Sequence, residues 1–223
     1  SLYLDTVAPK GTVKSGSTTI PNGGYVNGAF SYSATDTGGL SIMQYKTPNS
    51  SSWVTYTSGT NVTGDYGWYF FRAIDKAGNT SEEYSVYYDT SKPSGKVFSG
   101  KVEKPSGSYV NAEYIKYSAS DNNSTIATCY VKMPGSSYYS AYASETQLAT
   151  EGTYYFYSVD KSGNSSAVLS ITLDKTKPTG KIIGGGLVVA NGGSSNADYI
   201  AFYPSDSIGL YASYVKKPGY SDY

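Results

Sequence analysis

Acidic and amide side chains recur along this chain at a fixed interval of 85 residues. The recurring members are Asp36, Asp75 and Asn79 in one copy, and Asp121, Asp160 and Asn164 in the next. Carboxylate and amide oxygens are the ligands that Ca²⁺ prefers. Asp and Asn are also common in turns for purely conformational reasons. The residue types therefore leave two interpretations, a calcium site or turn formation, and the choice depends on which elements carry them.

A longer phrase repeats at the same interval. Residues Gly67–Asn79 read GWYFFRAIDKAGN, and residues Gly152–Asn164 read GTYYFYSVDKSGN. An aromatic run followed by D-K-small-G-N predicts a strand that ends in a tight turn, because Gly and Asn adopt positive φ at low cost. A fixed period of this kind indicates an array of one module rather than a single active-site cleft.

The module boundaries follow from an Asp-x-x-x-Pro segment that opens each repeat. Its prolines are Pro9, Pro93 and Pro178. We expect two complete repeats, at 6–89 and 90–174, and an incomplete third at 175–223. Residues 1–5 resemble the end of each repeat and are expected to form the last strand of an upstream repeat. Each complete unit is long enough for one small sandwich core.

Composition excludes several classes of function. The net charge is zero, so no basic surface argues for nucleic acid or an anionic membrane. No apolar run reaches the ~20 residues needed to span a bilayer. The chain has no His and one Cys, which excludes His-dependent catalysis and an intrachain disulfide. No nucleophile–base pair and no phosphate loop is present, so we expect a non-catalytic protein without a resident cofactor, calcium excepted.

Short alternating segments predict an all-β fold, with Gly and Pro punctuation every 8–12 residues. In the 68–75 segment, one face carries Tyr69, Phe71 and Ala73, and this face is the expected core side. We expect about seven strands per repeat. In the first repeat they are predicted near 10–15, 29–35, 41–47, 53–57, 60–63, 68–75 and 82–89.

These motifs together resemble a known family. The Asp-x-Thr-x-Pro opening, the A-T-D loop, G-x-Y-x-F-x-A-x-D-K-A-G-N and the closing D-T are similar to bacterial Ig-like domains. Such domains occur as tandem repeats in cell-surface adhesins and secreted multidomain proteins. The resemblance implies immunoglobulin-like β-sandwiches in a rod-like array, located at the bacterial cell surface or secreted.

The resemblance also implies roles for four aromatic residues. The segment Asp65–Tyr69 reads D-x-G-x-Y, the tyrosine-corner pattern of Ig sandwiches. The expected corner residues are Tyr69 and Tyr154. Phe71 and Phe156 stand where antibody domains place a cysteine, so packing is expected to replace the disulfide. Thr150 stands where the first repeat has Asp65, so the corner is expected to be less secure in the second repeat.

Two kinds of covalent chemistry known in adhesins are disfavoured by the sequence. A thioester between Cys129 and Gln147 needs a dedicated fold and an accessible thiol, and Cys129 instead alternates onto the same face as Val131. We expect Cys129 to be a small buried core residue. Spontaneous Lys–Asn or Lys–Asp isopeptide bonds need a buried Lys, a buried amide or carboxyl partner and a catalytic carboxylate nearby. The acidic residues Glu82, Glu83 and Glu151 do not recur between the repeats, so we expect them to be solvated surface charges.

Ig topology brings the calcium candidates together. The loop after the second strand, the last hairpin and the incoming linker lie at one end of such a sandwich. Asp5 is therefore expected to join the first set of oxygens, and Asp89 the second. The prediction is a calcium-stiffened joint between modules, weighed against plain turn formation.

Tyrosine-rich strands leave a second function open. Trp53 and Tyr138 are candidate residues for stacking on a glycan or contacting a host protein. The leading expectation is a non-catalytic spacer, or stalk, in an adhesin-like protein that forms a monomeric rod. The alternatives are a binding module or an accessory domain of a large secreted hydrolase.

The incomplete third repeat is expected to expose an aromatic edge. We expect this repeat to be disordered, or to be completed by residues outside this sequence or by another chain. Leu2–Asp5 is one segment that would donate a strand to such a neighbour, although it cannot replace the counterpart of the 68–75 strand.

Overall fold

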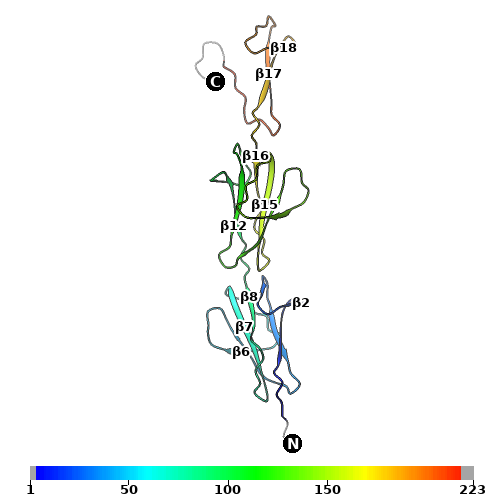
Figure 1. Ribbon diagram of the computed structural model, residues 1–223, viewed down its shortest axis with the longest axis vertical. Coiled ribbons are helices and arrows are strands. Elements are labelled where there is room, and N and C mark those ends of the chain that lie inside the picture. Colours follow the sequence, from blue (N-terminus) through cyan, green and yellow to red (C-terminus); the bar gives the residue numbers. More distant parts are fainter. Residues whose placement is uncertain (1–3, 217–223) are drawn as a thin grey trace.

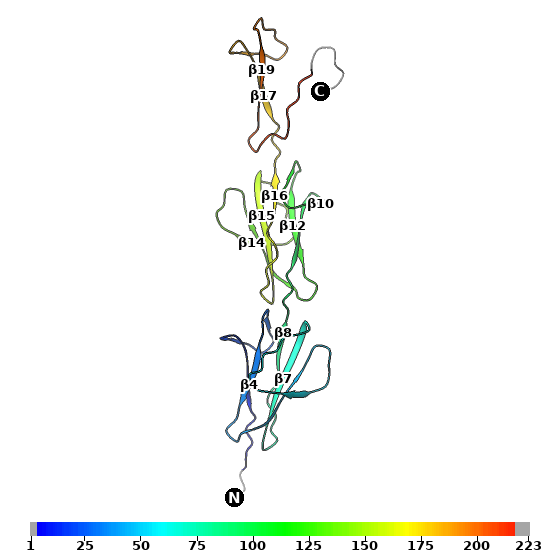
Figure 2. The same ribbon diagram turned by 180° about the vertical axis from the view of Figure 1, so that it is seen from behind.

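The computed structural model describes residues 4–216 as an elongated chain of three β-sheet lobes, one after another along the long axis (Figure 1). The reverse view shows the same succession (Figure 2). Strands β1–β8 form the first lobe, called module 1, and β9–β16 form module 2. Strands β17–β19 form the third lobe. The described residues contain no helix that is long and apolar enough to cross a membrane.

Each complete module has eight strands in the same order. In module 1 they are β1 (Lys10–Ser15), β2 (Thr18–Ile20), β3 (Gly24–Val26), β4 (Ser31–Thr35), β5 (Leu40–Lys46), β6 (Val54–Tyr56), β7 (Gly67–Asp75) and β8 (Tyr84–Tyr88). In module 2 they are β9 (Ser94–Ser99), β10 (Val102–Lys104), β11 (Ser108–Val110), β12 (Ile115–Ser120), β13 (Ile126–Lys132), β14 (Ser140–Tyr142), β15 (Gly152–Asp160) and β16 (Leu169–Leu173). The third lobe has β17 (Thr179–Gly184), β18 (Leu187–Val189) and β19 (Ile200–Ser205).

Two sheets pack face to face in each complete module. Module 1 has a three-stranded sheet of order β2-β1-β4 and a five-stranded sheet of order β3-β8-β7-β5-β6. Module 2 repeats this as β10-β9-β12 and β11-β16-β15-β13-β14. The first strand of the large sheet runs parallel to the last strand of the module, with Gly24 opposite Val86. All other pairs are antiparallel, so each module is an immunoglobulin-like β-sandwich.

The predicted strand count was too low by one. The segment near 60–63 is not a strand and contributes one isolated bridge, between Phe30 and Val62. The short strands β2 and β3 were missed, because three residues show too little alternation to be recognised. The sequence Pro21-Asn22-Gly23 between them is a turn signal that marks the pair.

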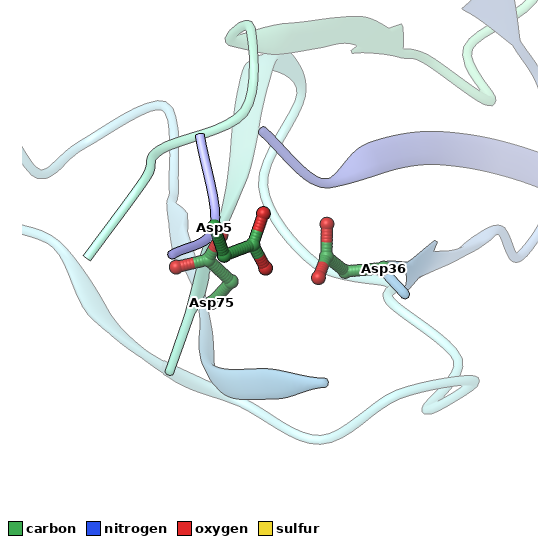
Figure 3. A group of neighbouring side chains, drawn as sticks. All are labelled: Asp5, Asp36 and Asp75. Carbon is green, nitrogen blue, oxygen red and sulfur yellow. The ribbon is translucent and has the colours of Figure 1, made fainter. Parts of the chain in front are cut away.

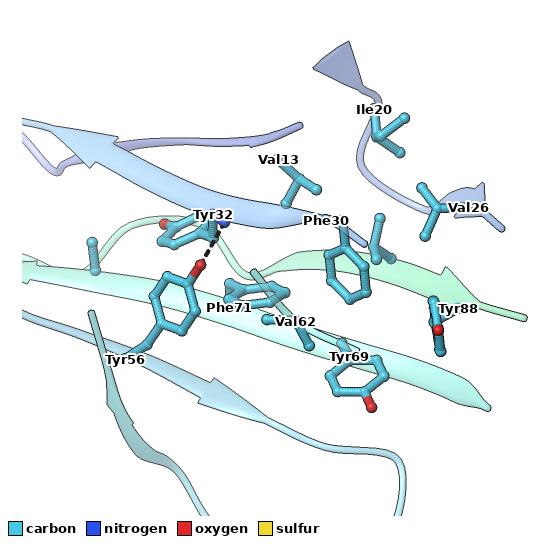
Figure 4. Packing of buried hydrophobic residues seen from close by; sticks show 12 residues of the cluster. Val13, Ile20, Val26, Phe30, Tyr32, Tyr56, Val62, Tyr69, Phe71 and Tyr88 are labelled. Carbon is cyan, nitrogen blue, oxygen red and sulfur yellow. Dashed lines mark hydrogen bonds between the residues drawn. The ribbon is translucent and has the colours of Figure 1, made fainter. Parts of the chain in front are cut away.

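The core is built from the predicted face of β7. Tyr69, Phe71 and Ala73 are at most 2% exposed, while Arg72 on the opposite face is partly exposed. Figure 4 shows the rings of Tyr69 and Phe71 packed against Phe30, which directly precedes β4, and against Tyr32 in β4 of the small sheet. In module 2 the equivalent stacking, of Tyr117 on Phe156, has ring centroids 5.1 Å apart. Aromatic packing thus fills the space that a disulfide spans in antibody domains.

The tyrosine corner is present in both modules. The hydroxyl of Tyr69 donates to the carbonyl of Asp65 at 3.1 Å, and the hydroxyl of Tyr154 donates to the carbonyl of Thr150 at 2.6 Å. The expectation of a less secure corner in the second repeat was wrong. The acceptor is a backbone carbonyl, so the side chain at Thr150 does not decide the bond.

The third lobe contains one three-stranded sheet, of order β18-β17-β19. Several of its large apolar side chains are half or more exposed, among them Leu187, Ile200, Phe202 and Tyr203. An exposed aromatic surface was expected here from the missing counterpart of the large sheet. At the other end, residues 1–3 of the predicted upstream strand lie outside the described residues, and residues 4–9 contain no strand.

Candidate cation sites at the module joints

Three carboxylates meet at the end of each module where the chain enters. In module 1, Asp36 follows β4, Asp75 ends β7, and Asp5 lies in the incoming segment. One oxygen from each lies within 4.8 Å of the others. Figure 3 shows the three carboxylate groups gathered in front of the strand ends. We call this group the first Asp cluster.

Module 2 repeats the arrangement at its joint with module 1. Asp121 follows β12, Asp160 ends β15, and Asp89 directly follows β8 of module 1. Their oxygens again lie within 4.8 Å of one another. This second Asp cluster therefore contains residues on both sides of the joint. The structure brings together the carboxylates that the sequence pattern singled out, together with the two linker residues.

The hairpin asparagines hold two of these carboxylates in place. Asn79 donates its backbone N–H to Oδ1 of Asp75 at 2.8 Å and its Nδ2 to Oδ2 at 2.7 Å. Asn164 makes the same two bonds to Asp160, at 2.8 and 2.9 Å. Desolvation acts to raise the pKa of Asp75, but the hydrogen bonds from Asn79, Gly78 and Ala77 together outweigh it and lower the pKa. Asp75 is therefore held as an anion.

The asparagines also fasten the linker. Asn79 Nδ2 donates to the carbonyl of Asp5 at 3.1 Å, and Asn164 Nδ2 donates to the carbonyl of Asp89 at 2.9 Å. Their amide nitrogens, rather than their oxygens, thus face the clusters. Sequence reasoning grouped both asparagines with the ligand oxygens, whereas the structure gives them the part of positioning the carboxylates and the linker.

The other two carboxylates of the second cluster are each oriented from one side only. Oδ1 of Asp89 accepts the backbone N–H of Ser91 at 2.7 Å. Oδ1 of Asp121 accepts the N–H groups of Asn123 and Ser124, at 2.8 and 2.7 Å. The Oδ2 atoms of Asp89 and Asp121 are buried and have no hydrogen-bond partner among residues 4–216. The Oδ2 atoms of Asp89 and Asp121 are thus held in position without a hydrogen-bond donor among the described residues.

A third joint has part of the same set. Oδ1 of Asp174 accepts the N–H of Thr176, and Oδ1 of Asp206 accepts those of Ile208 and Gly209. These two backbone bonds lower the pKa of Asp206. Its Oδ2 is buried and unpartnered within the described residues. No third carboxylate in the described part of the chain joins these two.

Modules 1 and 2 also touch through side chains beside the second cluster. The ammonium of Lys161, in the last hairpin of module 2, lies 5.6 Å from the ring centroid of Tyr25 in β3. The hydroxyl of Tyr87, in β8, donates to the carbonyl of Asn123 in module 2. The linker residue Pro93 is buried. The joint is therefore a packed contact with no free tether between the modules.

The two candidate ligand-binding residues lie in different surroundings and in different modules. The ring of Trp53 is covered by cations, with Lys46 Nζ at 4.4 Å and Arg72 Cζ at 4.3 Å from its centroid. Tyr138 is 72% exposed. The structure does not bring Trp53 and Tyr138 together into one surface.

Cys129 lies in β13 between β14 and β15, where it faces Tyr142 and Ser158. It is buried, and burial raises the pKa of its thiol. A neutral, enclosed thiol is a packing residue, as the alternation of β13 predicted.

Comparisons with known proteins give one distant structural match. No protein-family model and no curated protein matches the chain. Among solved structures, it is similar to the Clostridium thermocellum CbhA fibronectin(III)-like modules at 17% identity and a TM-score of 0.38. That match covers 74% of this chain and 93% of the other. At this identity and TM-score the match carries no argument about function. The chain is, on its own topology, a tandem array of immunoglobulin-like β-sandwiches.

Proposed function

We propose that this chain is a non-catalytic spacer, the stalk segment of a bacterial cell-surface or secreted adhesin-like protein. The observation that supports this most is the position of Asp89 at the joint. Its backbone N–H donates to the carbonyl of Val26 in module 1 at 3.0 Å, while its own carbonyl accepts from Asn164 in module 2. One linker residue is thus hydrogen-bonded into both sandwiches.

A joint of this kind favours a rod over a flexible string of domains. Bending it requires loss of the Asn164 bond, the Tyr87 bond and the contact between Lys161 and Tyr25. Each buried hydrogen bond contributes about 1 kcal/mol and the cation–π contact about 0.5–1 kcal/mol. The sum exceeds thermal energy several-fold, so the straight arrangement is favoured.

The strand order within each module suits a load-bearing element. The last strand, β8, is held in the large sheet between β7 and the parallel strand β3. Tension applied through the linker at Asp89 pulls along β8, which loads its hydrogen bonds to both neighbours in shear. The same arrangement recurs with β16 between β15 and β11.

Small-angle X-ray scattering of the full chain in calcium-containing buffer tests this proposal. We expect the profile of an extended particle that matches the straight arrangement of modules 1 and 2. The variant Asn164→Ala removes the hydrogen bond to Asp89 and is expected to give a more compact, averaged profile. Asn79→Ala makes the same change where the chain enters module 1, away from the joint with module 2, and serves as the matched control. A wild-type profile that requires freely jointed modules would contradict the proposal.

The alternative, a binding module, is tested separately on a glycan array and by pull-down with host proteins. The exposed ring of Tyr138 is the observation that favours it. Reproducible micromolar binding that is lost in Trp53→Ala or Tyr138→Ala would replace the spacer function with a binding function. Absence of binding, together with an extended scattering profile, supports the spacer.

A further inference from the structure

We propose that each Asp cluster binds one Ca²⁺ ion. The first site is formed by Asp5, Asp36 and Asp75, and the second by Asp89, Asp121 and Asp160. This inference goes beyond the spacer function. A rod can be stiff without metal, and a metal can bind without stiffening the rod.

The unsatisfied oxygens of the second cluster carry the argument. Asp89 is fully buried and Asp160 is 2% exposed. The Oδ2 atoms of Asp89 and Asp121 are enclosed in the cluster without a donor among the described residues. Burying a carboxylate is costly unless a compensating charge or hydrogen bond is present, and three carboxylates in one site repel each other. A bound cation supplies the missing charge at the place where the oxygens converge.

The donor set favours calcium over other metals. All three ligating groups are carboxylates, and the chain has no His, so the soft or imidazole-rich sites of zinc and copper are absent. The oxygens lie within 4.8 Å of one another, so their separations do not exceed that of opposite ligands in a Ca²⁺ shell of radius ~2.4 Å, and one ion can contact all three. Mg²⁺ needs a tighter octahedron at about 2.1 Å and gives up its water reluctantly.

The surrounding hydrogen bonds prepare the site for an ion. Backbone N–H groups hold Oδ1 of Asp89 and Oδ1 of Asp121, which leaves the Oδ2 atoms for the metal. Asn164 holds Asp160 and the linker carbonyl together. Such outer contacts fix the orientation of ligating carboxylates and raise metal affinity. Water would complete the shell.

The two sites are expected to differ in affinity. In the second cluster, Asp89 and Asp160 are both buried, whereas in the first, Asp5 and Asp36 are partly exposed. Buried charges are screened less by water and salt than exposed ones. We therefore expect two binding events, the tighter one at the joint between modules 1 and 2, in the range of about 10⁻⁵ to 10⁻³ M that is typical of weaker sensor and extracellular calcium sites.

The test uses the full chain, stripped with chelator at pH 7.5. Calorimetric titration with CaCl₂ is expected to give two ions per chain. The melting temperature is expected to rise by about 10 °C at 100-fold excess of calcium over the dissociation constant. MgCl₂ at the same concentration is expected to give a much smaller rise.

Two substitutions locate the tighter site, and a third substitution serves as the control. Asp121→Asn and Asp89→Asn are each expected to abolish the tighter event and to leave the weaker one. Glu103→Gln removes one charge from module 2 at an exposed ion pair and is expected to leave both events intact. Because Asp89→Asn also changes the linker, circular dichroism without calcium checks that each variant is folded.

Terbium luminescence, sensitised by nearby tyrosine, measures metal binding at the second Asp cluster directly and does not depend on a change in protein stability. A decrease of the signal in Asp121→Asn, but not in Glu103→Gln, supports the proposal. Absence of calorimetric heat, together with one melting temperature in calcium and in chelator, would overturn it. Scattering measures the shape of the chain and tests the spacer function, whereas calorimetry measures calcium binding and tests this inference. Failure of one proposal is therefore distinguishable from failure of the other.

Discussion

At the residue scale, one pair of equivalent positions shows how the two modules diverged. Tyr32 and Tyr117 are both fully buried, and each ring lies against a glycine of the neighbouring strand, Gly11 or Gly95. A Cβ at Gly95 would lie 2.4 Å from the Tyr117 hydroxyl, so glycine is required beneath the ring. The hydroxyl of Tyr117 donates to Ser158 at 3.2 Å. The hydroxyl of Tyr32 has no hydrogen-bond partner in residues 4–216.

This difference predicts a stabilising substitution. Ala73 occupies in β7 the position that Ser158 occupies in β15. Ala73→Ser places a hydroxyl opposite Tyr32 and is expected to stabilise module 1 by about 1 kcal/mol, because a buried donor gains its acceptor. The reciprocal change, Ser158→Ala, is expected to destabilise module 2 by about 1–3 kcal/mol. Hydrogen-exchange mass spectrometry of β7 and β15 measures the two modules separately. Slower exchange in β15 of Ser158→Ala than in wild type would refute this account.

The sequence correctly predicted which side chains are buried where their direction follows from the two-residue alternation of a β-strand. Tyr69 and Phe71 alternate with Phe70 along β7, and the pleat alone puts them in the core. The meeting of Asp36 with Asp75 followed from Ig topology. The part played by Asn79 did not, because the direction of an amide group is set by neighbours that only the folded chain supplies. The sequence likewise does not show that Oδ2 of Asp89 is buried without a hydrogen-bond donor among the described residues.

At the element scale, the short strand β14 carries a residue that links the sheets. The hydroxyl of Tyr142 accepts the backbone N–H of Tyr117 at 3.1 Å and donates to the carbonyl of Thr146. Figure 4 shows the equivalent bond in module 1, between Tyr56 and Tyr32. The long strands β7 and β15 were predictable from their nine-residue alternation, whereas β14, with three residues, depends on this tertiary bond.

Burial of the Tyr142 hydroxyl gives the fold an alkaline limit. Burial raises the pKa of Tyr142 to about 12, above its ordinary value of 10. The folded state therefore keeps this proton after the unfolded state has lost it, so stability is fully present below pH 10 and falls as pH rises toward 12. The loss is on the order of 2 kcal/mol.

Urea unfolding midpoints between pH 8 and 12, followed by circular dichroism in the wild type and in Tyr142→Phe, measure this loss. Tyr142→Phe is expected to be less stable at pH 8, because it leaves the Tyr117 N–H unpaired, but to show a flatter decline above pH 10. Equal slopes in the variant and the wild type would show that Tyr142 does not set the alkaline limit.

At the scale of the whole molecule, rigidity depends on what lies between the sandwiches. The repeat length and the linker pattern predict separate modules in a row. They do not reveal that Asp89 is hydrogen-bonded to Val26 on one side and to Asn164 on the other. Nor do they reveal the contact of Lys161, in a turn of module 2, with Tyr25 in β3, since this contact forms only where the two modules meet.

The distance between modules 1 and 2 in solution tests the central claim most directly. Spin labels at Ser58→Cys and Ser144→Cys, both exposed, report it by double electron–electron resonance, and the native Cys129 is buried away from the label. In calcium-containing buffer we predict a single narrow distance distribution that broadens in Asn164→Ala and stays narrow in Asn79→Ala. A broad distribution in the wild-type chain under the same conditions would contradict a rigid joint and, with it, the spacer function.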